Sequence, residues 1–259
     1  MVVISASNYQ FFNFRILQNI QKKKEKQHLF NSSSSSPIKS ESSELEIRVC
    51  VNRTCRKQGS RETLDILSSL APPHVSVTSC GCLGKCGSGP NLVFLPQAVF
   101  VSHCATPARI AQVLATYLGK DDTDDPSRNL AALALRKRAE EELEKGNLSE
   151  AEVLLSQAID LKPSGGLHII YTTRSSTRLA IGKNMGALED AKEALALAPY
   201  HPQAYLCQGN AFLALEEFVA AENSYSIALQ NDPSIRRSKS FKAWVTKLQD
   251  KLTAADISS

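Results

Sequence analysis

The chain of 259 residues lacks any long apolar run and carries little net charge. A helix that spans a bilayer needs about 18 or more consecutive apolar residues, so we expect no transmembrane helix. The formal net charge of +4 at pH 7 is small, and no nucleic-acid partner is expected. A chain of this length accommodates one or two domains.

Recognisable catalytic motifs are also lacking. The sequence contains no C-x-x-C redox pair, no phosphate-binding glycine loop and no evident Ser-His-Asp set. Four of the histidines are scattered without a ligand-like grouping: His74, His103, His168 and His201. We therefore predict that the chain is not an enzyme. The enzymatic alternative is a thiol oxidoreductase that uses Cys80 and Cys82.

Cysteines are few and unevenly distributed. Seven cysteines in a chain of this length are too few for a disulfide scaffold. Five of them fall between residues 50 and 86, and such local concentration indicates metal or redox chemistry. Cys104 and Cys207 stand alone, and we predict that they are buried small apolar residues.

Four of the clustered cysteines have a spacing that suits metal ligands. Cys50 and Cys55 form a C-x4-C pair, and Cys82 and Cys86 form a C-x3-C pair. Two pairs of thiolates brought face to face can hold two sulfide-bridged irons or one zinc. Zinc motifs commonly use C-x2-C spacing, which neither pair has. A structural zinc and a metal-free fold stay open as alternatives.

Glycines and basic residues surround these cysteines. The glycines let the backbone turn tightly, so that exposed N–H groups can donate to the sulfurs. Basic side chains beside the thiols would lower their pKa values and offset the negative charge of a cluster. We interpret them as a positive rim that docks an acidic electron-transfer partner, with a plain solvated loop surface as the alternative. The rim residues are Arg53, Arg56, Lys57, Arg61 and Lys85.

Residues 45–119 have the apolar pattern of a small α/β sheet with helices packed on it. Ser60 is expected to cap the first helix. Strands are expected at 46–51, 75–78, 91–95 and 98–101, with helices over 61–70 and from Thr106 onwards.

This order of elements, with the segments CVNRTC, GCLGKCGSGPN and VSHCATPARIAQVL, resembles the thioredoxin-like [2Fe–2S] ferredoxin family. That family includes the small iron–sulfur subunit of respiratory NADH dehydrogenase. The resemblance implies a [2Fe–2S] cluster held by Cys50, Cys55, Cys82 and Cys86. Cys80 departs from the family pattern as an extra thiol, and we assign it no role.

From residue 130 the sequence repeats itself. Pro163, Pro199 and Pro233 are separated by 36 and 34 residues, and Gly165-Gly166 accounts for the two extra residues. Small residues recur at the same intervals, at Ala139, Ser175 and Gly209 and again at Ala158, Ala194 and Ala228. This pattern resembles the tetratricopeptide repeat (TPR) and implies an all-α solenoid. We expect repeats at 132–165, 168–201 and 202–235 and a capping helix over 238–253.

Repeats of this family present a concave groove that binds a protein or peptide segment. One subtype grips the terminal carboxylate of chaperones with Lys, Asn and Arg side chains. Arg136 alone keeps the needed charge, and Glu140 would repel a carboxylate, so we do not expect this clamp. Arg174 and Arg178 are expected either to line the groove or to form a solvated helix face. The positions that match the clamp are Arg136, Glu140, Thr173, Gln203 and Cys207.

The first 44 residues have the composition of a transit peptide. They lack acidic residues before Glu25, and they contain the Lys22–Lys24 run and the Ser32–Ser36 tract. The serine tract favours the plastid (chloroplast stroma), with the mitochondrion as an alternative location. A tail without targeting function is the remaining interpretation.

These patterns divide the chain into five segments. The predicted function is a [2Fe–2S] redox, electron-transfer or cluster-sensing module coupled to a TPR protein-binding array, similar to plant plastid TPR proteins. It would act as an organellar assembly or redox factor. The alternative is a non-redox interaction scaffold whose cysteine domain is structural, with zinc or without metal. The segments are 1–44 (transit peptide), 45–119 (ferredoxin domain), 120–129 (acidic linker), 130–235 (three repeats) and 236–259 (capping helix and tail).

Overall fold

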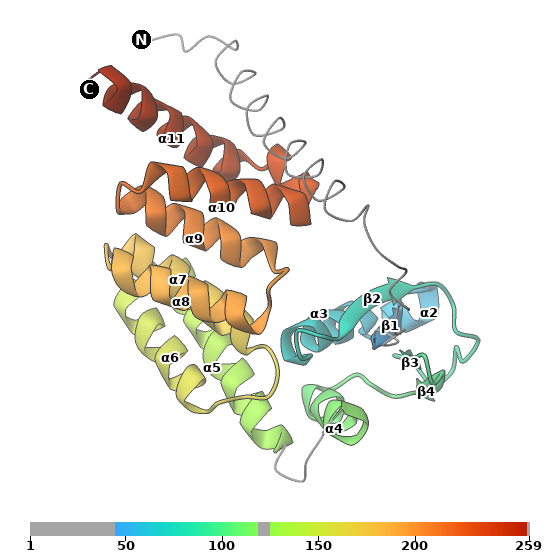
Figure 1. The fold of residues 1–259 in the computed structure, drawn as a ribbon. Helices are drawn as coiled ribbons and strands as arrows, with labels where there is room; N and C mark the ends of the chain where they lie inside the picture. The colour runs from blue at the N-terminus through green and yellow to red at the C-terminus, as the bar shows by residue number, and fades with distance from the viewer. Residues whose placement is uncertain (1–44, 119–124, 258–259) are drawn as a thin grey trace, which may run out of the picture.

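A computed structural model describes residues 45–118 and 125–257. A small α/β part is followed along the chain by a larger all-helical part (Figure 1). The predicted transit segment, 1–44, and residues 120–124 of the predicted linker lie outside the described residues. Within the described ranges, no helix combines the length and the apolar character that crossing a membrane requires.

The α/β part contains a four-stranded sheet in the order β2-β1-β3-β4. β1 pairs in parallel with β2 and antiparallel with β3, and β3 pairs antiparallel with β4. The predicted strands and helices occur in the predicted order, and the short helix α2 is an additional element. The elements are β1 (Glu46–Cys50), α2 (Arg53–Lys57), α3 (Ser60–Leu70), β2 (Ser76–Cys80), β3 (Leu92–Leu95), β4 (Val99–Val101) and α4 (Pro107–Leu118).

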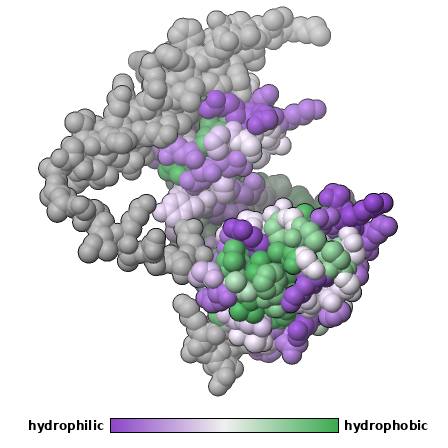
Figure 2. Space-filling view, turned by 90° about the vertical axis from the view of Figure 1, so that its right-hand side faces the viewer, coloured by the Kyte–Doolittle hydropathy of each residue, from purple (hydrophilic) through white to green (hydrophobic). Residues whose placement is uncertain are grey.

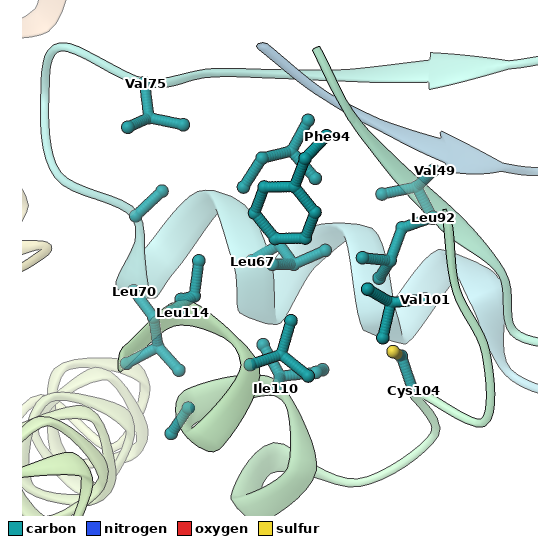
Figure 3. Packing of buried hydrophobic residues seen from close by; sticks show 14 of the residues in the cluster. Val49, Leu67, Leu70, Val75, Leu92, Phe94, Val101, Cys104, Ile110 and Leu114 are labelled. Carbon is teal, nitrogen blue, oxygen red and sulfur yellow. The ribbon is translucent and has the colours of Figure 1, made fainter. Parts of the chain in front are cut away.

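The core of this part lies between the sheet and helices α3 and α4. Strand β1 alternates, with Ile47 and Val49 fully buried and Arg48 between them exposed. Burying such an aliphatic side chain contributes about 1.5–3 kcal/mol. Figure 3 shows the packed side chains, which include Val49, Leu67, Leu70, Leu92, Phe94, Ile110 and Leu114.

Two local features differ from the expectations. Helix α2 was not expected, and it begins at Asn52, whose Oδ1 accepts a hydrogen bond from the Arg53 N–H at 2.6 Å. Ser60 is not the cap of α3. Gly59 occupies that position at φ +89°, a conformation that glycine adopts without strain, so Ser60 is drawn into the helix and buried.

The helical part is a stack of three antiparallel helix pairs with a final helix, so the three predicted repeats and the capping helix are confirmed. The first helix begins inside the predicted linker, because the Asp125 carboxylate accepts the Ser127 N–H at 2.8 Å and Pro126 fits the first turn. The helices are α5 (Pro126–Glu144), α6 (Leu148–Asp160), α7 (Leu167–Ala180), α8 (Asn184–Leu197), α9 (Pro202–Ala214), α10 (Phe218–Asn231), the 3-10 turn η1 (Pro233–Arg237) and α11 (Lys239–Ile257).

The recurring small residues lie where paired helices approach most closely. Ala139 and Ser175 are fully buried, and a Cβ atom at Gly209 would overlap the ring of Tyr225 on α10. The capping helix α11 covers this last pair: Phe241 meets the Tyr225 ring edge-on at a centroid distance of 5.7 Å. Apolar side chains of α11 thereby close the stack, as predicted.

Candidate functional sites: the cysteine loops and the array cavity

The sheet brings the two cysteine pairs to one edge. β1 and β2 run in parallel, and their last residues, Cys50 and Cys80, lie side by side in register. The chain leaves β1 into α2, which carries Cys55, and leaves β2 into the loop that carries Cys82 and Cys86. Because parallel strands end at the same edge, both cysteine segments start from neighbouring positions.

The four predicted ligands lie near one another, but they do not form a closed set of metal ligands. The Sγ atoms of Cys82 and Cys86 are 3.5 Å apart, and the Cys50 sulfur interacts with the thiols of both Cys55 and Cys82. Cys50 and Cys55 are buried, whereas Cys82 and Cys86 are exposed. Across residues 45–118 and 125–257, no three histidine, cysteine or acidic side chains gather closely enough to hold a metal ion. The donor set itself fits a [2Fe–2S] cluster, which takes four thiolates.

Backbone amides surround these sulfurs. The Gly84 N–H donates to Cys82 Sγ at 3.4 Å. Burial opposes ionisation of Cys50, yet its pKa falls below the usual value because the backbone N–H groups of Asn52 and Leu83, together with neighbouring thiols, donate to its sulfur. Amides aimed at sulfur are the surroundings that stabilise thiolate charge. The surroundings of Cys50 therefore favour its thiolate form, which is the form that binds a metal.

The pKa values of Cys55 and Cys86 shift in the opposite direction. Burial, and then the neighbouring Cys50, raises the pKa of Cys55. A hydrogen bond with Cys82, and then the negative charge that Cys82 can carry, raises the pKa of Cys86. Four thiols so close together resist simultaneous ionisation, and a bound cation would relieve that repulsion.

Asn91 was missed by the sequence analysis. It is buried, and its Nδ2 atom donates to the Lys85 carbonyl at 2.6 Å and reaches Cys55 Sγ at 3.5 Å. It thereby ties the second cysteine loop to the first. Gly89 allows this approach, because a Cβ there would lie 2.9 Å from Cys55 Sγ. The only sequence signal was their place in the GCLGKCGSGPN stretch.

The other three cysteines are not among the four predicted ligands, although Cys80 lies beside Cys50. Burial, and then the nearby Cys50, raises the pKa of the partly exposed Cys80. Cys104 and Cys207 are buried, as predicted. Burial raises the pKa of Cys104 to about 11, so it remains a neutral thiol at physiological pH.

The basic rim is solvent-facing. Arg53, Arg56, Lys57, Arg61 and Lys85 are all exposed, and none forms an ion pair with a carboxylate within the described part of the chain. Lys85 Nζ lies 5.2 Å from the centroid of the half-exposed Phe100 ring. Figure 2 shows an apolar area with hydrophilic residues around it on the side of the molecule that carries the α/β part.

The array has a cavity of about 240 Å³ on helix α7, between α5 and α9. Its wall is rich in hydroxyl groups, and the lining residues include no charged side chain. The hydroxyls of Thr172, Thr173 and Thr177 each donate to the carbonyl four residues earlier, at 2.7–2.9 Å. Their remaining capacity is to accept. The lining residues are Leu143, Thr172, Thr173, Ser176, Thr177, Ala180 and Gln203.

The residues at the clamp positions offer little to grip a carboxylate. Thr173 and Gln203 line the cavity, but neither carries charge. Arg136 is 8% exposed and is already paired with Glu140 at 3.1 Å. Cys207 is buried, with its Sγ 3.1 Å from Ser176 Oγ. The positive charges that a terminal carboxylate requires are therefore absent or engaged among these five residues.

Arg174 and Arg178 take neither of the two expected roles. Arg174 makes a two-pronged contact with Asp190 on α8, at 3.0 and 2.7 Å. Arg178 bridges Asp190 and Glu152 of α6, at 3.0 and 2.9 Å. Lys183 completes the group at 2.7 Å from Glu152. This ionic network joins three helices, so both arginines hold the array together and are absent from the lining of the cavity.

Comparisons with known proteins found curated relatives that match part of this chain. No family model matches the chain. It is 45% identical over 78 residues to the Protein STIP1 homolog of Dictyostelium discoideum, covering 30% of this chain and 14% of that protein. It is 28% identical over 107 residues to the mitochondrial import receptor subunit TOM34 of Pongo abelii, covering 39% and 35%. The chain thus spans little more than a third, or less, of these relatives' lengths.

Two solved structures are similar to part of this chain. The first TPR of Spaghetti (RPAP3), bound to the HSP90 peptide SRMEEVD, matches at 23% identity and a TM-score of 0.43, covering 48% of this chain and 94% of that one. A variant of the thioredoxin-like [2Fe–2S] ferredoxin from Aquifex aeolicus matches at 23% identity and a TM-score of 0.26, covering 29% and 86%. The helical half of this chain is a stack of three helix pairs with a final helix, and it is joined to a small α/β part.

Proposed function

We propose that this chain is a protein-binding scaffold whose TPR array holds an extended, uncharged protein segment. The observation that carries the proposal is the cavity on α7, with its hydroxyl-rich wall free of charged residues. The threonine hydroxyls already donate their hydrogen bonds to carbonyl groups of their own helix. Their oxygen lone pairs can therefore accept hydrogen bonds from backbone or side-chain N–H groups of a ligand. A segment that ends in a carboxylate does not match this wall.

A peptide-display selection on the full chain tests this assignment. Enriched peptides should be uncharged and should bind without a free carboxyl terminus, whereas the acidic peptide SRMEEVD should not bind. Thr173→Lys, in the wall, should abolish binding of the selected peptides. Ser149→Lys, on the exposed start of α6, should leave it unchanged. Tight binding of SRMEEVD, or equal effects of the two lysine variants, would overturn the assignment.

A second proposal concerns the cysteine domain, which we infer to be a thioredoxin-like ferredoxin domain that holds a [2Fe–2S] cluster. It is supported by the convergence of Cys50, Cys55, Cys82 and Cys86 and by the amides aimed at Cys50 and Cys82. When bound, the cluster would supply one-electron transfer. The protein would hold it through the four thiolates, neutralise it with backbone N–H groups, and present its exposed cysteine pair to a partner.

Cysteine variants distinguish this proposal from a structural zinc or a metal-free domain. In protein purified without air, Cys82→Ser should weaken or shift the visible absorption of the cluster, because one thiolate is replaced by a poorer ligand. Cys104→Ser should leave the spectrum unchanged, since that thiol is buried away from the four ligands and is expected to stay protonated. A colourless wild-type protein would refute the cluster and leave the scaffold proposal intact.

We further propose a plastid location, with the mitochondrion as the alternative, on the composition of residues 1–44 alone. An import assay with isolated chloroplasts and mitochondria tests it. Uptake and shortening of the chain by chloroplasts are expected. Exclusion from both organelles would refute an organellar function.

A further inference from the structure

We infer that the glycine insertion in the TPR array is a docking site for the end of helix α3, so that the two halves of the chain form one rigid unit. The insertion is the pair Gly165-Gly166, which lengthens the first repeat interval from 34 to 36 residues. The inference concerns the chain's own two domains, and it requires neither a bound peptide nor a cluster.

The first observation is the close approach of two backbones. A Cβ atom at Gly165 would overlap the Leu70 carbonyl oxygen, and one at Gly166 would overlap that of Ser69. Gly166 also has a φ of +70°, which favours glycine. Figure 1 shows the loop between α6 and α7 beside the end of α3. Only residues without a side chain permit this contact.

The loop is held in position from the array side. Asn129 on α5 donates from Nδ2 to Ser164 Oγ at 2.8 Å and accepts the Ser164 N–H at 2.9 Å. Both bonds lie immediately before the two glycines. The inserted loop is therefore tied to α5 and presents its glycines at a defined place.

A side-chain contact crosses the same junction. Arg136 Nη2 donates to Ser69 Oγ at 2.9 Å, while its Nη1 pairs with Glu140. Arg136, the residue at the first clamp position, therefore binds a side chain of the cysteine domain within the same chain. A hydrogen bond from a charged donor contributes more to stability than a neutral one does.

The apolar core is continuous across the junction. Leu133 of α5 belongs to the same buried cluster as Leu70 of α3 and Leu114 of α4, and Leu130 packs against it. Backbone contact, a charged hydrogen bond and a shared core thus meet at one place. A core of this kind resists separation of the domains, whereas a plain linker would let them move independently. The consequence is a fixed placement of the cysteine site relative to the array cavity.

Nitrogen-15 relaxation of the full chain measures whether the halves tumble together. We expect one rotational correlation time for both halves of the wild type. Gly166→Ala should separate the two values, because the new methyl group forces the loop away from α3. Gly182→Ala is the matched control: it has a φ of +81° but open space around its Cβ, so it carries the same backbone strain without the clash. Independent tumbling of the wild-type halves, or equal effects of the two variants, would overturn the inference.

A milder pair of variants covers the case in which Gly166→Ala does not fold. Ser68 and Ser69 are neighbours on α3, and each hydroxyl donates to the carbonyl four residues earlier at 2.8 Å. Of the two, Ser69 also accepts a hydrogen bond from Arg136. Ser69→Ala should speed hydrogen exchange of the last turn of α3 roughly 2- to 10-fold more than Ser68→Ala does. Identical exchange in the two variants would contradict the docking.

Discussion

The two halves of this molecule use basic side chains in opposite ways. In the array, Arg174 and Arg178 are mostly buried and meet carboxylates on two neighbouring helices. Around the cysteines, Arg53 and Lys57 point into solvent and meet no carboxylate in the ranges that the structure describes. The same residue types therefore hold a fold together in one half and remain available to a partner in the other.

Whether a basic side chain is paired or unpaired indicates its role more clearly than its residue type does. A buried charge that is paired on several sides is costly to disturb, and its neighbours fix its geometry. An exposed charge without a partner contributes little to stability, but it adds to the field that a docking protein meets. Substitutions in the two halves should therefore change different measurements.

The largest effect is expected at the centre of the array network. Asp190→Ala removes the carboxylate that both Arg174 and Arg178 contact, and the Asp190 side chain is only 3% exposed. The loss leaves the Arg174 guanidinium without its carboxylate and Arg178 with Glu152 alone. It should lower the free energy of unfolding by about 3–5 kcal/mol, measured by urea denaturation. Lys145→Ala, which breaks the exposed pair with Glu142, should change it little. Equal losses in both variants would mean that the network is not structural.

A smaller loss is expected at the closest helix contact of the third repeat. Gly209→Ala places a methyl group against the Tyr225 ring and should cost about 1–3 kcal/mol of unfolding free energy. Trimming the ring in the double variant with Tyr225→Leu should recover part of that loss, because the two sites are in direct contact. Strict additivity of the two substitutions would argue against the contact.

The period of the repeats could be predicted from the sequence, but the reason for each small residue could not. Ala139, Ser175 and Gly209 occupy equivalent slots, yet only Gly209 faces a tyrosine ring that leaves no room for a Cβ. The packing partner lies on another helix, and the linear pattern does not identify it. Gly165 is a second example. The sequence indicates a plain loop insertion there, whereas in the structure the end of α3 lies against it.

The sequence predicted that Cys50, Cys55, Cys82 and Cys86 lie near one another, and their role as cluster ligands stays a prediction. The spacing of the thiols and the resemblance to a ferredoxin indicated which four cysteines would meet. Asn91 gave no comparable signal, since a single buried amide acts through contacts that only the folded chain brings together. Arg174 and Arg178 were placed on one helix face correctly, but their carboxylate partners on other helices were not foreseen.

A pH-dependent loss of stability is expected at the edge of the array. Burial, and then His201 and Arg136, lowers the pKa of His168 from 6.5 to about 4. Between these two values the unfolded chain binds a proton that the folded chain does not, so the unfolding free energy should fall as the pH drops from 6.5 towards 4. His168→Gln should flatten this dependence in urea titrations. His74→Gln, at an exposed position, should not, and a similar flattening there would contradict the assignment.

The smallest change in stability, and the clearest change in interaction, is expected on the rim. Replacing Arg53, Arg56 and Lys57 together by alanine should leave urea unfolding nearly unchanged, because these side chains are exposed and unpaired. It should slow electron exchange with an acidic soluble ferredoxin and flatten the dependence of that rate on salt. A rate that ignores salt in the wild type would show that the rim has no docking role.

The metal and sulfide content of the anaerobically purified full chain tests the central claim most directly. The account predicts two irons and two acid-labile sulfides per chain, bound through Cys50, Cys55, Cys82 and Cys86. One zinc per chain, or no metal at all in a folded protein, would contradict it and would leave the chain as a binding scaffold with a structural cysteine domain.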